Sequence, residues 1–153
     1  MDLSPSLIGT AREGASLLVT RGRLRLFAKA TGQQDPVFVD VDAARRAGHP
    51  DLPVPPTFFF AVGLELPAPL DFLKDLGVDL GALLHGEQGF DYHRTAHAGD
   101  TLRSTPVITD VFEKRGGALK FLVTETRVAD QDDVPVATMR ETLVVRQPAG
   151  AGA

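Results

Sequence analysis

A histidine and a glutamate lie two residues apart in the second half of the sequence. His85 and Glu87 belong to a stretch with a period of two, and alternate residues of a strand share one face of a sheet. A histidine beside a carboxylate can exchange protons near neutral pH, so the pair is a candidate for acid–base catalysis. The competing interpretation is a structural pair or part of a dimer interface, which is the more common arrangement.

The other three histidines lie close to charged neighbours. His93 and His97 flank Arg94 near a predicted strand end, which favours a solvated strand end over a site for a phosphate or an acidic partner. His49 is predicted to be exposed in a loop near the mouth of the presumed pocket. These spacings fit no compact zinc pattern, and the chain has no cysteine, so we expect neither a metal nor a disulfide.

The rest of the chain is organised around the apolar stretch 54–66. Pro55 and Pro56 suit the first turn of a helix, and Pro67 ends it. Because Glu65 is the only charge in the stretch, the pattern predicts one helix over about residues 55–66, apolar on all sides and surrounded by protein. Glu65, near the helix end, is expected to reach solvent.

The residues around this helix predict an α+β fold. Helices are expected over residues 21–32 and 40–48, and a helical turn is expected near 72–76. Residues 15–20 form a candidate short strand. Four long strands are expected at about 84–93, 101–114, 119–129 and 134–146, joined as an antiparallel meander. We interpret residues 1–147 as a single domain and 148–153 as a flexible C-terminal tail.

Composition excludes several classes of function. The 153 residues are 43% hydrophobic and 24% charged, as in ordinary globular proteins. The formal net charge of −4 argues against non-specific nucleic-acid binding. The N-terminus lacks the pattern of a signal peptide and no stretch is long enough to cross a membrane, so a cytoplasmic protein is expected.

Two stretches resemble a known family. FAKATGQQDPVFVD (27–40), followed by PPTF (55–58), resembles the opening of MaoC-like dehydratases, and HGEQGFDYHR (85–94), AGDTL (98–102) and VFEKRGG (111–117) resemble the N-terminal, fatty-acid-synthase-like branch of that superfamily. The resemblance covers about residues 20–146. It implies a hot-dog fold, in which an antiparallel sheet wraps around the central helix. It also implies a dimer with a continuous sheet, and hydration or dehydration of acyl thioesters.

The sequence departs from the family at the catalytic positions. When the sequence is matched to the family motif Gly-Asp-x-Asn-Pro-x-His, Gln33 occupies the position of the catalytic Asp and Phe38 that of the catalytic His. Neither side chain can exchange a proton near neutral pH. The remaining catalytic candidates are Asp35, His85 and Glu87. The resemblance also implies substrate contacts from Gln33, Phe38, Thr57 and Phe58, with the thioester carbonyl at the helix N-terminus, where Thr57 and Phe58 carry N–H donors.

Three functional hypotheses follow. The first is a subunit that binds acyl or enoyl thioesters and works with a partner carrying the intact Asp/His pair. The second is a self-sufficient hydratase using His85 with Glu87 or Asp35. The third is a non-enzymatic acyl-binding homodimer. None requires a cofactor, because the CoA or carrier-protein thioester would be the substrate, and none involves nucleic acid or a membrane.

Overall fold

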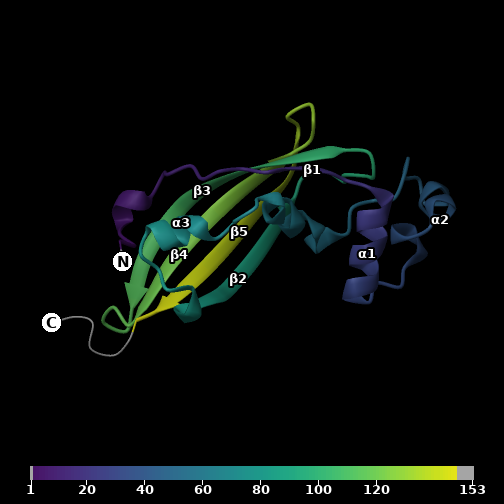
Figure 1. The fold of residues 1–153 in the computed structure, drawn as a ribbon. Coiled ribbons are helices and arrows are strands. Elements are labelled where there is room, and N and C mark those ends of the chain that lie inside the picture. The colour runs from purple at the N-terminus through teal and green to yellow at the C-terminus, as the bar shows by residue number, and fades with distance from the viewer. Residues whose placement is uncertain (1, 148–153) are drawn as a thin grey trace.

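The computed structural model describes residues 2–147, which form one five-stranded antiparallel sheet in the order β1-β3-β4-β5-β2 (Figure 1). The strands are β1 (Ser16–Leu18), β2 (Leu83–Tyr92), β3 (Thr101–Lys114), β4 (Leu119–Ala129) and β5 (Pro135–Arg146). The α-helices are α1 (Arg21–Thr31), α2 (Val41–Arg46) and α3 (Asp71–Asp75). The 3₁₀ segments are η1 (Pro5–Leu7), η2 (Pro36–Phe38), η3 (Pro56–Glu65) and η4 (Leu80–Ala82).

The predicted strands are confirmed, but the position of one of them in the sheet differs from the prediction. β3, β4 and β5 form a meander, whereas β2 crosses over to pair with β5 at the far edge of the sheet. The long connection between Tyr92 and Thr101 permits this crossover, which a pattern of local periods does not reveal. The predicted tail at 148–153 lies outside the described residues.

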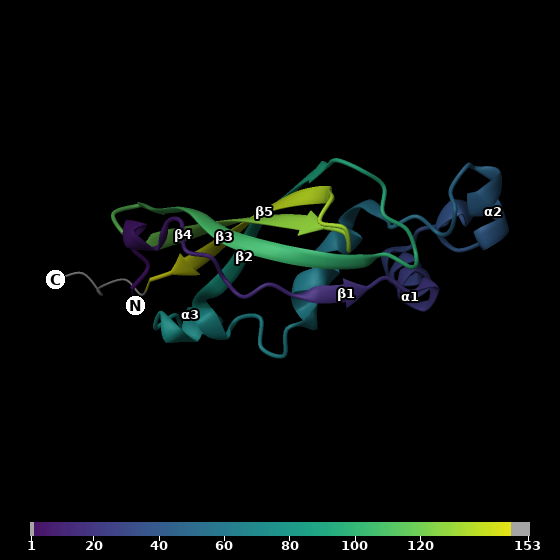
Figure 2. The same cartoon turned by 90° about the horizontal axis from the view of Figure 1, so that it is seen from above.

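Three register shifts bend the sheet, one of them between Val128 and Ala129 where β4 pairs with β5. The other two lie between His85 and Glu87 in β2, and between Ile108 and Asp110 in β3. A bulge adds one residue to a strand, bends it and increases its twist. Gly86 is required in the β2 bulge, because a Cβ there would lie 2.8 Å from Val144 Cγ2. The resulting concave face receives η3 and α3 (Figure 2).

The central segment η3 differs from its prediction. It is a 3₁₀ helix with one buried face, formed by Phe58, Phe59 and Val62. Its other side is open: Phe60 is 40% exposed and Leu64 is 57% exposed. The expectation of a helix surrounded by protein is therefore wrong for this chain alone, because the sheet covers only one of its sides.

The core lies between the concave face and the segments packed on it. One cluster joins η3 to β1, α1 and the ends of β3, β4 and β5 that lie nearest them; a second joins α3 to the opposite ends of the same strands. The first includes Leu24, Leu52, Phe58, Val62, Leu102 and Val128, and the second includes Leu73, Ile108, Leu122, Leu143 and Val145. None of the helices within residues 2–147 has the length and hydropathy of a membrane span.

The segment with α1 and α2 extends beyond the end of the sheet (Figures 1 and 2). α1 begins after Thr20, whose side chain accepts a hydrogen bond from the Arg23 N–H, and it ends at Gly32 with φ of 69°. Arg23 donates to both carboxylate oxygens of Glu65, at 2.6 and 3.2 Å, which ties α1 to the end of η3. Glu65 thus lies at the surface, as expected, and this hydrogen bond lowers its pKa.

Candidate ligand-binding site

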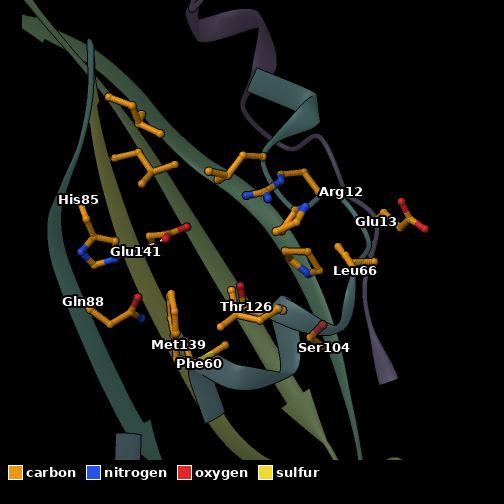
Figure 3. Close-up of a pocket in the computed structure, with 17 residues that line it drawn as sticks. Arg12, Glu13, Phe60, Leu66, His85, Gln88, Ser104, Thr126, Met139 and Glu141 are labelled. Carbon is orange, nitrogen blue, oxygen red and sulfur yellow. Dashed lines mark ion pairs between the residues drawn. The ribbon is translucent and has the colours of Figure 1, made fainter. Parts of the chain in front are cut away.

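A cavity of about 320 Å³ lies between the open side of η3 and the concave face of the sheet (Figure 3). This volume is at the lower end of the range for small-molecule sites. Most of its lining is apolar and comes from Phe60, Leu64, Leu66, Pro69, Leu70, Leu83, Pro106, Met139 and Leu143. Its polar side chains are those of Arg12, Glu13, His85, Gln88, Ser104, Thr126 and Glu141.

His85 lines this cavity, and its carboxylate partner is Glu141 rather than Glu87. The His85 Nε2 lies 3.4 Å from a Glu141 carboxylate oxygen, and the His85 ring meets the Phe60 ring edge-on at 6.2 Å. Glu87 is not in the lining, because the extra residue Gly86 shifts the alternation by one and Glu87 pairs with Thr142. The prediction that His85 and Glu87 share a face is therefore wrong.

Arg12 enters the cavity from the N-terminal segment, which runs along β3. Its backbone N–H donates to the Pro106 carbonyl at 2.9 Å, and the guanidinium carbon lies 3.5 Å from the centroid of the Phe72 ring. Nη1 donates to the Thr124 hydroxyl at 3.3 Å. Burial lowers the pKa of Arg12, and the charge of Glu141 across the cavity opposes that shift.

Two residues of the cavity lining carry unsatisfied polar atoms that are themselves buried. Within residues 2–147, two buried side-chain atoms lack a hydrogen-bond partner, Arg12 Nε and Gln88 Oε1, and both residues line this cavity. Gln88 Nε2 is bonded to the Arg140 carbonyl at 3.2 Å, and Gln88 faces Glu141 in the strand register. A buried polar atom without a partner costs about 1–3 kcal/mol, so such atoms call for an explanation.

The residues at the family's catalytic positions lie elsewhere. Gln33 and Asp35 are exposed in the segment that extends beyond the sheet, and Phe38 is half-buried there. Gln33 Oε1 accepts from the Asp35 N–H at 3.0 Å, and Asp35 Oδ1 accepts from the Val37 N–H at 3.0 Å. Both polar side chains thus serve as local backbone caps, and neither lines the cavity.

The first turn of η3 offers fewer donors than predicted. The Phe58 N–H donates to the Pro55 carbonyl at 3.0 Å, and the Phe58 ring is buried against Phe27 at 5.4 Å. Thr57 is exposed. Neither residue lines the cavity, which begins further along η3 at Phe60. Thr57 is therefore the remaining donor at this end.

The remaining histidines form local contacts. His49, predicted to be exposed, is half-buried, and its Nδ1 lies 3.1 Å from His97 Nε2. Burial lowers the pKa of His97, and the charge of His49 adds to this effect. Arg94 is ion-paired with the buried carboxylate of Asp130, and His93 Nε2 lies 2.8 Å from the Thr138 hydroxyl. His93 and Arg94 are exposed, as the solvated strand end predicts.

Sequence reasoning missed Arg12 and Glu141. Arg12 lies in a stretch without a clear period, and Glu141 is one charge among several on a predicted strand. They approach the same cavity from positions far apart in the chain. A signal for Glu141 was nevertheless available: in β5 it alternates with Met139 and Leu143, which places a charge on the apolar face.

A curled antiparallel sheet with a central helix and an adjoining cavity defines a hot-dog protein, as expected. Residues 6–139 match the family described as FAS1-like, dehydratase domain region. The chain therefore belongs to this dehydratase family of the MaoC-like superfamily, which confirms the resemblance seen in the sequence.

Relatives and solved structures agree with this assignment. A UPF0336 protein of Clavibacter michiganensis is 37% identical over 95% of this chain and 97% of its own length. A UPF0336 protein of Leifsonia xyli is 40% identical over 84% of this chain and 85% of its own length. The 3R-hydroxyacyl-ACP dehydratase complex HadBC of Mycobacterium tuberculosis gives a TM-score of 0.75 at 26% identity, covering 90% and 96%. The ChsH1–ChsH2 complex of the same organism has the same fold, with a TM-score of 0.75 at 22% identity, covering 93% and 87%.

Proposed function

We propose that this protein binds acyl or enoyl thioesters as one subunit of a hydratase or dehydratase, and that its partner subunit carries the catalytic Asp/His pair. The observation that carries the proposal is the separation of two features. A ligand-sized apolar cavity lies beside η3, whereas the family's catalytic positions hold Gln33 and Phe38, away from that cavity. The cavity supports a role in binding an acyl group, and positions 33 and 38 lack the side chains that the family uses for proton transfer.

Unpartnered surfaces support a partner subunit. Phe60 and Leu64 leave an apolar surface at the mouth of the cavity. β2 pairs with β5 on one side, and its other edge has no strand partner within residues 2–147. An open strand edge beside exposed apolar side chains is a template for pairing with another chain. Similarity to the HadBC and ChsH1–ChsH2 complexes also favours a heterodimer, and a cytoplasmic location remains part of this proposal.

Blocking the cavity tests the binding role. A Cβ added at Gly63 meets nothing within 4 Å, and Gly63 lines the cavity, so Gly63→Phe fills the space without a backbone clash. We expect this variant to lose affinity for dodecenoyl-CoA at least tenfold in calorimetry. Gly22→Phe, on the exposed side of α1, is the matched control and should bind normally. Equal binding by the two variants would contradict a ligand role for the cavity.

One observation favours a second candidate, a self-sufficient hydratase. The His85–Glu141 pair at 3.4 Å places a histidine and a carboxylate inside the cavity, although not the predicted pair with Glu87 or Asp35. This candidate requires the isolated chain to hydrate enoyl-CoA and His85→Ala to abolish that activity. Dodecenoyl-CoA binding without turnover, in a protein that forms only homodimers, would instead indicate an acyl-binding homodimer.

A further inference from the structure

The polar side chains in the apolar cavity form two opposed groups. Arg12 points into the cavity from the N-terminal segment, toward Glu141 on β5 (Figure 3). On the far wall, Glu141, Gln88 and His85 lie side by side on β5 and β2. Glu13, which also borders the cavity, points away from it (Figure 3). An apolar ligand that filled the cavity would therefore contact polar groups on both walls.

The hydrogen bonding of these groups is incomplete. Arg12 has no carboxylate within 4 Å in the described residues, and its Nη1 donates one long hydrogen bond, of 3.3 Å, to the Thr124 hydroxyl. Arg12 Nε lacks an acceptor and Gln88 Oε1 lacks a donor. A purely apolar ligand would remove water from Glu141 and from the accessible part of the guanidinium without replacing the lost hydrogen bonds. A ligand with its own polar group would offset that cost.

The charges select the kind of polar group. Arg12 carries a positive charge and Glu141 a negative one, so a carboxylate that approached Arg12 would also approach Glu141. A hydroxyl avoids this repulsion, because its oxygen accepts from Arg12 while its hydrogen donates to Glu141. A ketone can only accept, so it would satisfy one wall alone.

We infer that the cavity selects acyl chains that carry a neutral hydroxyl at their far end, held between Arg12 and Glu141. This inference rests on the proposed function, because it takes the thioester to lie at the Thr57 end of η3. The 3₁₀ rise of about 2.0 Å per residue separates Thr57 from Leu66 by about 18 Å. Figure 3 places Phe60 at one end of the cavity, with Leu66 and Arg12 toward the other.

Calorimetry with matched ligands tests the inference on the full chain. The probes are acyl-CoAs from octanoyl to tetradecanoyl, each ending in a methyl, an ω-hydroxyl or an ω-carboxyl group. At the length that reaches Arg12, we expect the ω-hydroxyl ligand to bind about tenfold tighter than its methyl-terminated match, the effect of roughly one hydrogen bond to a charged group. The ω-carboxyl ligand should show no such gain.

Two variants test the contributions of the two cavity walls separately. Arg12→Met should remove the preference for the ω-hydroxyl, measured as the ratio of the affinities for matched hydroxyl-terminated and methyl-terminated chains. Glu141→Gln removes the opposing charge and should raise affinity for the ω-carboxyl ligand about tenfold. Glu125→Gln is the matched control, because Glu125 lies on the other face of the sheet, paired with Arg140, and should change nothing.

The outcomes distinguish this inference from the proposed function. Binding of methyl-terminated chains without a gain from the ω-hydroxyl would overturn the inference and leave the thioester-binding role standing. A gain from the ω-carboxyl in the unaltered chain would likewise overturn it. Failure of every acyl-CoA to bind would overturn both.

Discussion

Replacing Gly14 with alanine should detach the N-terminal segment from β3. A Cβ at Gly14 would lie 2.0 Å from the Ser104 carbonyl oxygen, and ordinary contact begins at 3.4 Å, so the strands must separate by about 1.4 Å. That movement breaks the bonds from Ser104 N–H to the Ala15 carbonyl, from Ala15 N–H to Ser104 Oγ and from Arg12 N–H to the Pro106 carbonyl, each 2.9 Å long. At about 1 kcal/mol each, the loss is about 3 kcal/mol in the free energy of unfolding.

Urea denaturation measures this loss, provided that the slope of the unfolding free energy against urea concentration is the same in the variant. Gly63→Ala is the matched control: its added Cβ meets nothing, and alanine suits a helical segment, so stability should stay equal or rise by about 0.5 kcal/mol. Because Arg12 is held by the same segment, Gly14→Ala should also reduce the preference for an ω-hydroxyl. A change in unfolding free energy within about 0.5 kcal/mol for Gly14→Ala would refute this reasoning.

Three further predictions concern the bulge, the histidine pair and the open surface. Gly86→Ala places a Cβ 2.8 Å from the Val144 side chain and should lower the free energy of unfolding by about 1–2 kcal/mol. Thermal unfolding measures this change, and an unchanged melting temperature would contradict the bulge geometry. The pKa of His97 is lowered from 6.5, so as the pH falls the unfolded chain takes up this proton before the folded chain does. The free energy of unfolding should therefore decrease below about pH 6.5, and His49→Gln should make that decrease smaller. A free energy of unfolding that stays constant below pH 6.5 would contradict this prediction. The double variant Phe60→Ser, Leu64→Ser should weaken association with the partner about a hundredfold, because it loses about 3 kcal/mol of apolar burial. Sedimentation of the complex measures this loss. Unchanged sedimentation would show that this surface is not the interface.

Much of the fold was predictable because local signals agree with it. The period of two located β3, β4 and β5, and Gly32 and Asp40 are residues typical of a helix end and a helix start, where α1 ends and α2 begins. The crossover of β2 was not predictable in this way, since pairing partners are set by long-range packing. The open side of η3 was also missed, because an apolar sequence predicts burial without saying whether the same chain provides it.

The candidate site was harder to predict than the fold. His85 does line the cavity, but the single extra residue at Gly86 moves Glu87 to the other face and brings Glu141 to His85 instead. Alternation alone could not reveal that shift. Asp35 and Gln33 carry local capping bonds instead of lining the cavity.

The most direct test is the hydration of crotonyl-CoA and longer enoyl-CoAs, measured for the isolated chain and for the chain co-purified with a subunit that carries the intact Asp/His pair. We expect no turnover above background for the isolated chain and measurable turnover for the complex, with longer substrates losing rate when Gly63→Phe fills the cavity. Hydration by the isolated chain at an enzyme-like rate, at or above about 1 per second, would contradict this expectation.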